Sequence, residues 1–187
     1  MKTKKLSILS KPFLILTLLF QFNLYSQFNI EAGFGGVSGD LSDQLSSSVL
    51  FDFQYNIIDI YESKDVPIRN TGYSESKEAF RFQTYLSGGI RYAFGKEKVD
   101  SIFENDVSFA PLGAGLRVGI LPFYLSVNGG YALSLTEQVE DGISYRASLS
   151  IKDFPFPFFN LTVSYENIEV NESSLEVIYG GFLIFID

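Results

Sequence analysis

Residues 116 to 135 read LRVGILPFYLSVNGGYALSL, a stretch with a single charge, Arg117. Its length matches the roughly 20 apolar residues that a membrane-spanning helix needs. Its composition does not, because Gly119, Pro122 and the run 128–130 are poor helix formers, and a proline costs a helix interior about 3 kcal/mol. Apolar residues instead alternate with small or polar ones on both sides of Pro122, which predicts two strands joined by a tight turn.

The same period of two recurs from Phe28 to the end of the chain, and each run is bounded by Gly, Asp, Asn, Ser or Pro. No window has the period of an amphipathic helix. The sequence therefore predicts an all-β protein, with strands at 28–37, 47–58, 80–94, 107–120, 123–135, 143–152, 157–167 and 174–186.

The two faces of these strands differ in composition. One face is apolar, and in the final strand we assign to it Leu175, Val177, Tyr179, Leu183 and Phe185. The other face is made of Gly, Ser, Asn and Arg, although glycine in a solvated strand packs nothing. Small residues between a few long cations fit the crowded interior of a narrow barrel, so we expect the apolar face to meet lipid.

This interpretation places a set of charged side chains in the barrel interior, where arginines would fork onto carboxylates. The predicted interior charges are Glu31, Asp52, Arg81, Arg91, Arg117, Arg146, Lys152, Glu166 and Glu176. The competing interpretation is that these are ordinary surface charges of a soluble sheet protein. In that case the Phe and Tyr face would point inward, as in a soluble periplasmic barrel that binds an apolar ligand.

The connections support a membrane barrel with one exception. Small bacterial outer-membrane barrels alternate short periplasmic turns with longer outer loops, and the chain does so from residue 107 onward, with acidic residues gathered in the long loops. The segment 59–79 is too long for a periplasmic turn. Either this turn is extended, or 57–62 and 99–103 add two strands. We expect an eight-stranded antiparallel up-and-down transmembrane barrel, with ten strands as the alternative, because the extra segments are shorter than the roughly 9 to 11 residues that a crossing strand needs.

The first 26 residues have the order of a secretory signal peptide: four lysines and no acid, the apolar run 13–20, and a small residue, Ser26, at the expected cut. We therefore divide the chain into a signal peptide (1–26) and a barrel domain (27–187). Removing the signal takes the net charge from −8 to −12. So acidic an exported protein is a poor nucleic-acid binder, because that affinity rests on neutralising phosphates.

The signal, the ten-residue alternating strands, the repeated Gly-Gly pairs (FGG, SGGI, NGGY, YGGF) and the closing IYGGFLIFID resemble small outer-membrane β-barrels of the OmpA or OmpX type. The Leu-Tyr-Ser-Gln cut site resembles those of secreted proteins from Bacteroidetes. The resemblance implies location in the outer membrane, contact with outer-membrane lipid, and assembly by the barrel-insertion machinery. That machinery usually reads a terminal Phe, whereas here Phe185 is followed by Ile186 and Asp187.

Nothing in the sequence indicates catalysis or a cofactor. Enzymes that resemble this fold use a histidine, and the chain has no His and no Cys, so serine–histidine chemistry lacks its base. Glu166 and Glu176 lie on neighbouring predicted strands and could form a carboxylate pair, or could pair with Arg146 or Arg117. The acidic loops lack the spacing of an EF-hand, and we predict no metal site.

These observations favour a non-enzymatic outer-membrane barrel that acts structurally, or through its acidic external loops on an unidentified partner, with its interior plugged by Arg–acid pairs. The alternative membrane function is a narrow, porin-like channel or transport accessory. Eight strands leave an interior that side chains fill, so any conductance would be small.

Overall fold

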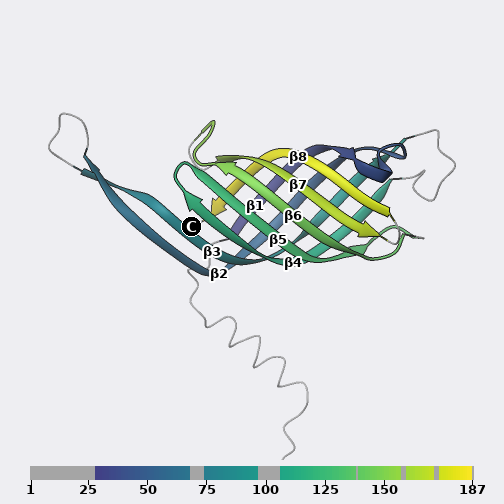
Figure 1. Cartoon of the computed structure of the whole chain (residues 1–187), viewed down its shortest axis with the longest axis horizontal. Coiled ribbons are helices and arrows are strands. Elements are labelled where there is room, and N and C mark those ends of the chain that lie inside the picture. Colours follow the sequence, from purple (N-terminus) through teal and green to yellow (C-terminus); the bar gives the residue numbers. More distant parts are fainter. Residues whose placement is uncertain are drawn as a thin grey trace, which may run out of the picture.

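The computed structural model describes residues 28–67, 74–96, 106–137, 139–156, 159–170 and 173–186. These residues form a closed antiparallel barrel in which each strand pairs with the next and β1 pairs with β8 (Figure 1). The strands are β1 (Phe28–Ser38), β2 (Leu45–Pro67), β3 (Ser74–Gly95), β4 (Val107–Ile120), β5 (Phe123–Ser134), β6 (Gly142–Ile151), β7 (Phe159–Val170) and β8 (Ser173–Ile186), with a short 3-10 helix, η1 (Gly39–Leu41), between β1 and β2. Among the described residues, no helix is long and apolar enough to cross a bilayer.

The eight-stranded prediction is confirmed, and the ten-stranded alternative is wrong. The segment 57–62 belongs to β2, because that strand runs without interruption to Pro67. The opening stretch of the sequence is the β4–β5 hairpin, with its turn at Leu121 and Pro122. The predicted signal peptide, 1–26, and the segment 99–103 lie outside the described residues.

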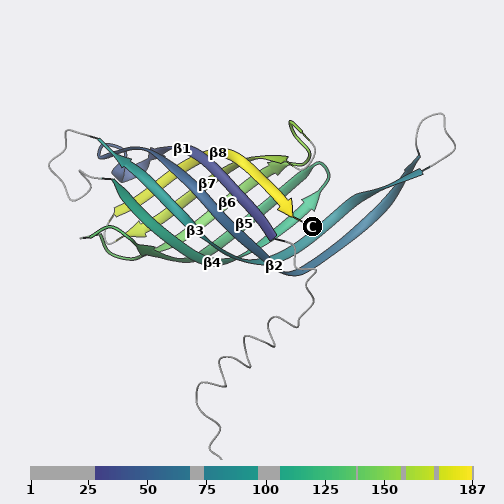
Figure 2. The ribbon, with the colours of Figure 1, turned by 180° about the vertical axis from the view of Figure 1, so that it is seen from behind.

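The barrel has two distinct ends. We call the end that carries Phe28, the turn at Pro122 and Ile186 the turn end, and the end that carries η1 and the connection 135–141 the loop end. At the turn end, β2 and β3 continue as a paired two-stranded ribbon well beyond the rest of the barrel (Figures 1 and 2). The long segment 59–79 is therefore an extended hairpin rather than a pair of extra wall strands.

Apolar side chains cover the outside of the barrel on all eight strands. The exposed fraction is 60% for Phe34, 65% for Ile120 and 59% for Leu125. Between them, the alternate positions turn inward and are buried, so the burial pattern of β6 reads as strict alternation. A soluble barrel with its aromatic face turned inward has the opposite arrangement, so that alternative is wrong.

Inward glycines make room for tyrosine rings on neighbouring strands. Gly115 pairs across β3–β4 with Tyr85, and Gly119 pairs across β4–β5 with Tyr124. A Cβ added to Gly115 would lie 2.4 Å from Cζ of Tyr85, and one added to Gly119 would lie 2.4 Å from Cε1 of Tyr124. Because no larger residue fits beside these rings, the glycines on the polar face are packing positions inside the barrel, as expected for a crowded interior.

The interior at the loop end is an apolar core, which the pattern of small and polar residues on the inward face did not predict. Its buried members come from several strands, from η1 and from the connection 135–141; they are Leu41, Leu45, Leu50, Ala93, Val107, Phe109, Ala132, Val139, Ile168, Val170, Leu175, Val177 and Tyr179.

This core overturns our assignment of faces in the final strand. Leu175, Val177, Tyr179 and Leu183 are buried inside the barrel, and it is Ile178 and Phe182 that face outward. Both faces of β8 are largely apolar, so alternation alone could not tell them apart. The apolar interior at the loop end decided which face turned in.

Candidate functional site: the charged network inside the barrel

A continuous chain of polar side chains runs through the middle of the barrel and towards the turn end. Eight of its members are charged, and all of these except Asp59, whose side chain is 17% exposed, are buried: Arg81, Arg91, Arg117, Arg146, Glu31, Asp52, Asp59 and Glu166. Four cations therefore face four carboxylates. Such a balance is what a low-dielectric interior requires, since an unpaired buried charge is costly.

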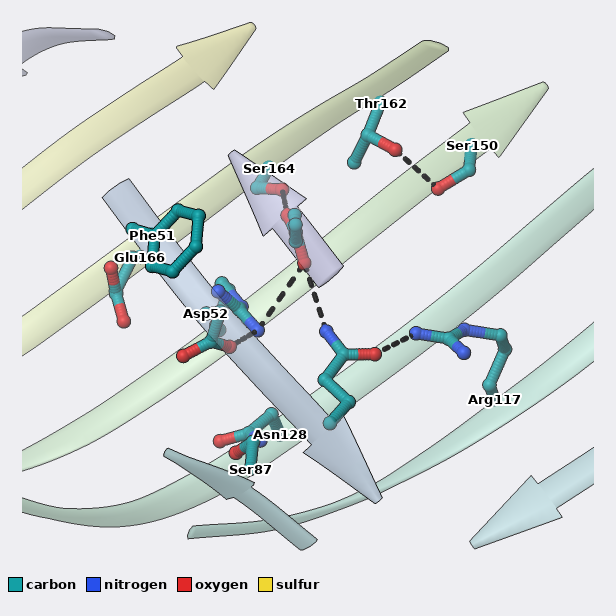
Figure 3. A network of polar contacts seen from close by, with 12 residues as sticks. Phe51, Asp52, Ser87, Arg117, Asn128, Ser150, Thr162, Ser164 and Glu166 are labelled. Atoms are coloured by element: carbon teal, nitrogen blue, oxygen red, sulfur yellow. Dashed lines mark hydrogen bonds and ion pairs between the residues drawn. The ribbon is translucent and has the colours of Figure 1, made fainter. Parts of the chain in front are cut away.

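The half of the network nearer the loop end is built from ion pairs, and Figure 3 shows Asp52 and Glu166 of this half together with Arg117. Arg91 Nε lies 2.5 Å from Glu166 Oε2, and Arg91 Nη1 lies 3.3 Å from Asp52 Oδ1. Arg146 Nη2 then bridges Asp52 Oδ2 at 2.5 Å and Glu31 Oε2 at 3.4 Å. These contacts link β1, β2, β3, β6 and β7 across the interior.

Arg117 joins this half of the network to the turn end through two glutamines. Its Nη1 donates to Gln83 Oε1 at 3.1 Å, and its Nη2 donates to Gln54 Oε1. Gln54 in turn donates to Glu31 at 3.0 Å, and Gln83 donates to Asp59 at 3.0 Å. Within the described residues Arg117 forms no ion pair. Arg117 is therefore connected to Glu31 through Gln54 and to Asp59 through Gln83.

Aromatic rings complete the surroundings of Arg117. Its guanidinium carbon lies 4.9 Å from the ring centroid of Tyr85 and 5.2 Å from that of Phe185, while Arg81 lies 5.3 Å from the same Phe185 ring. A cation over an aromatic face is attracted by the ring quadrupole, more strongly where water is excluded. Phe185, which we had placed in the lipid-facing set, thus contacts both arginines.

The pair of Arg81 and Asp59 closes the network at the turn end. Arg81 donates from Nε to Asp59 Oδ1 at 2.9 Å and from Nη2 to Oδ2 at 2.5 Å, a bidentate contact. Asp59 was not among the predicted interior charges. The inward positions of β2 are even-numbered up to Asn56, but a register shift between Asn56 and Ile58 makes the odd-numbered Asp59 point inward. Such a bulge leaves no mark in a period-two pattern.

Two of the predicted interior charges lie elsewhere. Glu176 is on the outer side of β8, where its Oε1 lies 3.5 Å from Ser174 Oγ, because its neighbours Leu175 and Val177 turn inward. The proposed carboxylate pair of Glu166 and Glu176 therefore does not form. Lys152 lies in the turn after β6, where its backbone N–H donates to the Pro122 carbonyl at 2.8 Å.

The geometry described here is suited to holding the strands together. Glu166, one member of the carboxylate pair considered from the sequence, forms an ion pair with Arg91 at 2.5 Å. Among the described residues, no group of three or more acidic side chains is arranged to hold a metal ion.

The fold is similar to that of known outer-membrane proteins. The structure of the Yersinia pestis outer membrane protein Ail in a phospholipid bilayer nanodisc matches with a TM-score of 0.50 and 16% sequence identity, covering 86% of this chain and 99% of that chain. The outer membrane enzyme PagL matches with a TM-score of 0.47 and 10% identity, covering 83% of this chain and 98% of that chain. No protein-family profile and no curated protein sequence matches the chain.

Proposed function

We propose that this protein is a non-enzymatic integral outer-membrane barrel, sealed along its interior, that acts through its acidic loop end. The observation that carries the proposal is the inverted distribution of polarity. Large apolar side chains cover the outside, whereas Arg91, Arg117 and Glu166 are 1 to 2% exposed in the interior. A bilayer is the solvent in which that arrangement is stable, because the outer face of the described strands is apolar and the charged side chains of the network lie inside the barrel.

The loop end supports an interaction role facing away from the cell. Its exposed acids are Asp40, Asp43, Asp106, Glu137, Glu140, Asp141 and Glu169, and Lys96 is an exposed cation among them. A surface of one sign raises the encounter rate with partners of the opposite sign and repels polyanions. With this orientation the turn end, and the ribbon of β2 and β3, lie in the periplasm.

Export is proposed to follow from the predicted signal peptide, and insertion from the barrel-insertion machinery. A Bacteroidetes source rests on the cut-site resemblance alone. A non-enzymatic role is supported by the absence of His and Cys from the sequence and by the ion pairing of the interior carboxylates.

The proposal is tested by running outer-membrane fractions on SDS gels before and after boiling. An intact membrane barrel resists SDS until it is heated, so the unboiled protein should migrate differently from the boiled protein. Recovery of the protein in the aqueous periplasmic extract, with no change of mobility on boiling, would exclude a membrane barrel.

Orientation is tested separately. The chain contains no cysteine, so Glu140→Cys at the loop end and Ser63→Cys on the ribbon each introduce a single thiol. A membrane-impermeant maleimide should label the first variant in intact cells and the second only after the outer membrane is permeabilised. The reverse pattern would show that the barrel is inserted the other way round.

A further inference from the structure

The β2–β3 ribbon leaves two strand edges open, and the longer one belongs to β2, because β3 runs past β4 only from Ser74 to Ala79. β1 pairs with β2 only as far as Phe28 and Tyr55, whereas β2 continues to pair with β3 as far as Pro67 and Ser74. Within the part of the chain that the structure describes, no strand lies beside β2 beyond Asn56 on the side away from β3. Figures 1 and 2 show this ribbon projecting past the end of β1 from both sides of the molecule.

We infer that this open edge of β2 is a docking site for an extended segment of a periplasmic protein, which would add to the sheet antiparallel to β2 and in line with β1. The inference rests on the proposed orientation, which places the ribbon in the periplasm. An unpaired edge presents a row of backbone N–H and C=O groups at strand spacing, and another strand is the ligand that satisfies them all.

The position of the edge supports a strand as its occupant. The β1–β2 ladder is an established pairing surface, and the open edge is its direct continuation, so an added strand needs only to extend a ladder that already exists. Near the barrel, the outer face of β2 carries Ile58 and Ile60, which are 47% and 58% exposed. Apolar side chains at alternate positions of the incoming segment would pack beside them.

A second copy of the protein fits this edge poorly. Two barrels inserted in one membrane in the same orientation have their β2 strands running in the same direction, whereas symmetric pairing of the same strand edge through a two-fold axis is antiparallel. Lipid fits poorly too, because acyl chains offer no groups to the backbone N–H and C=O of the ribbon.

The inference is tested by amide hydrogen exchange on the full-length protein in two settings: purified in phospholipid nanodiscs, and in outer-membrane vesicles isolated with their periplasmic contents. In vesicles, every second amide between Ile58 and Pro67 should exchange at least about tenfold more slowly than in nanodiscs, because only those facing the open edge gain a partner. Amides of β6, which are paired on both sides, serve as the internal reference and should not change.

Three results would overturn the inference. Equal exchange in both settings would mean that nothing pairs with the edge. Protection already present in nanodiscs that hold one copy would mean that the chain itself covers the edge. Protection in nanodiscs only when two copies are loaded would identify a second copy as the occupant.

Proline substitutions provide the matched pair of variants. Lys64 and Asp65 are adjacent in β2 and pair with Lys77 and Ser76, so their N–H groups point to opposite edges. One of Lys64→Pro and Asp65→Pro should block the open edge and remove the vesicle-specific protection, while the other should weaken only the ribbon ladder. Unchanged protection in both variants would also overturn the inference. Both variants should keep the heat-dependent gel shift, which shows that the barrel still folds. Labelling of Ser63→Cys shows independently whether the ribbon lies in the periplasm, so a wrong orientation can be distinguished from the absence of an added strand.

Discussion

At the scale of single residues, the interior charges are the positions on which stability depends most. Asp52 contacts two arginines, at 2.5 Å from Arg146 and 3.3 Å from Arg91, and its side chain is 2% exposed. Removing one member of such a group leaves the remaining charges buried without a partner. The loss of stability is then larger than the net stabilisation that the original ion pairs contributed.

Asp52→Asn should therefore lower the free energy of unfolding by about 3 to 5 kcal/mol, because two guanidinium groups lose the charge that balances them in the dry interior. The measurement is urea unfolding in lipid vesicles, followed by the heat-dependent gel shift. Asp43→Asn, at an exposed position of the loop end, is the control and should change little. Equal stability of the two variants would contradict the importance of the network.

Asp106 at the loop end gives a pH-dependent prediction. Its carboxylate accepts hydrogen bonds from Tyr92 Oη and, at 3.0 Å, from the Gly95 backbone N–H, and these bonds hold the pKa of Asp106 below its ordinary value of 3.8. A carboxylate with a lowered pKa stabilises the fold when ionised, so its contribution is complete above the ordinary value and is lost as the pH falls through the folded pKa.

At pH 7, Asp106→Asn should loosen the junction between Gly95 and β4. The difference from the unchanged protein should disappear as the pH falls through the lowered pKa of Asp106, because the native carboxyl then also becomes neutral. Amide exchange at Gly95, measured from pH 7 to pH 2, checks this. A difference between the two proteins that stays constant over the whole range would contradict the role of the carboxylate charge.

At the scale of the strands, the barrel wall is fitted together by glycine and tyrosine on neighbouring strands. Gly35 adds a third example, because a Cβ there would lie 2.9 Å from Cδ1 of Tyr179, its cross-strand partner. Each pair fixes the register of two strands, since a slip of one residue would turn a ring outward and leave a gap inside.

Gly115→Ala should destabilise the barrel by about 1 to 3 kcal/mol, because the new methyl group would overlap the Tyr85 ring. The control is Gly180→Ala, where a Cβ meets nothing within 4 Å and the change should stay within about 0.5 kcal/mol. In a double-mutant cycle, Tyr85→Leu should reduce the cost of Gly115→Ala. Additive effects would show that the ring and the glycine do not interact.

At the scale of the whole molecule, two different sets of side chains fill the barrel interior, one charged and one apolar. The charged network fills the middle and the turn-end side, and the apolar core that includes Leu41, Val139 and Leu175 fills the loop end. An ion that crossed the barrel would have to pass an apolar segment after leaving the polar one. We therefore expect that the protein does not act as the narrow channel that the sequence left open.

The purified protein should give no stepwise conductance in planar bilayers, and Arg117→Ala alone should give none either, because the apolar core at the loop end remains closed. The control is a porin recorded in the same bilayers, which shows that channels would be detected. Steady steps from the unchanged protein would contradict the sealed interior.

Most of the fold could be predicted from the sequence because the barrel wall is a local pattern. The alternation of apolar and small or polar residues on either side of Pro122 determined two strands and their turn, and the glycines and arginines on one face determined which side was the interior. Arg91, Arg117 and Arg146 were placed inside on this basis, and the structure has them there, 1 to 4% exposed.

The sequence by itself thus determined the strand count, the turns and the inward face of most strands, since each depends on residues that are neighbours along the chain. Only the tertiary structure decided three other features. They are the inward turn of Leu175 and Val177, the entry of Asp59 through a β-bulge, and the extension of β2 and β3 beyond the barrel. The first depends on apolar residues that meet inside the barrel from strands far apart in the sequence. The other two depend on how β2 and β3 pair with each other, which a pattern of period two does not record.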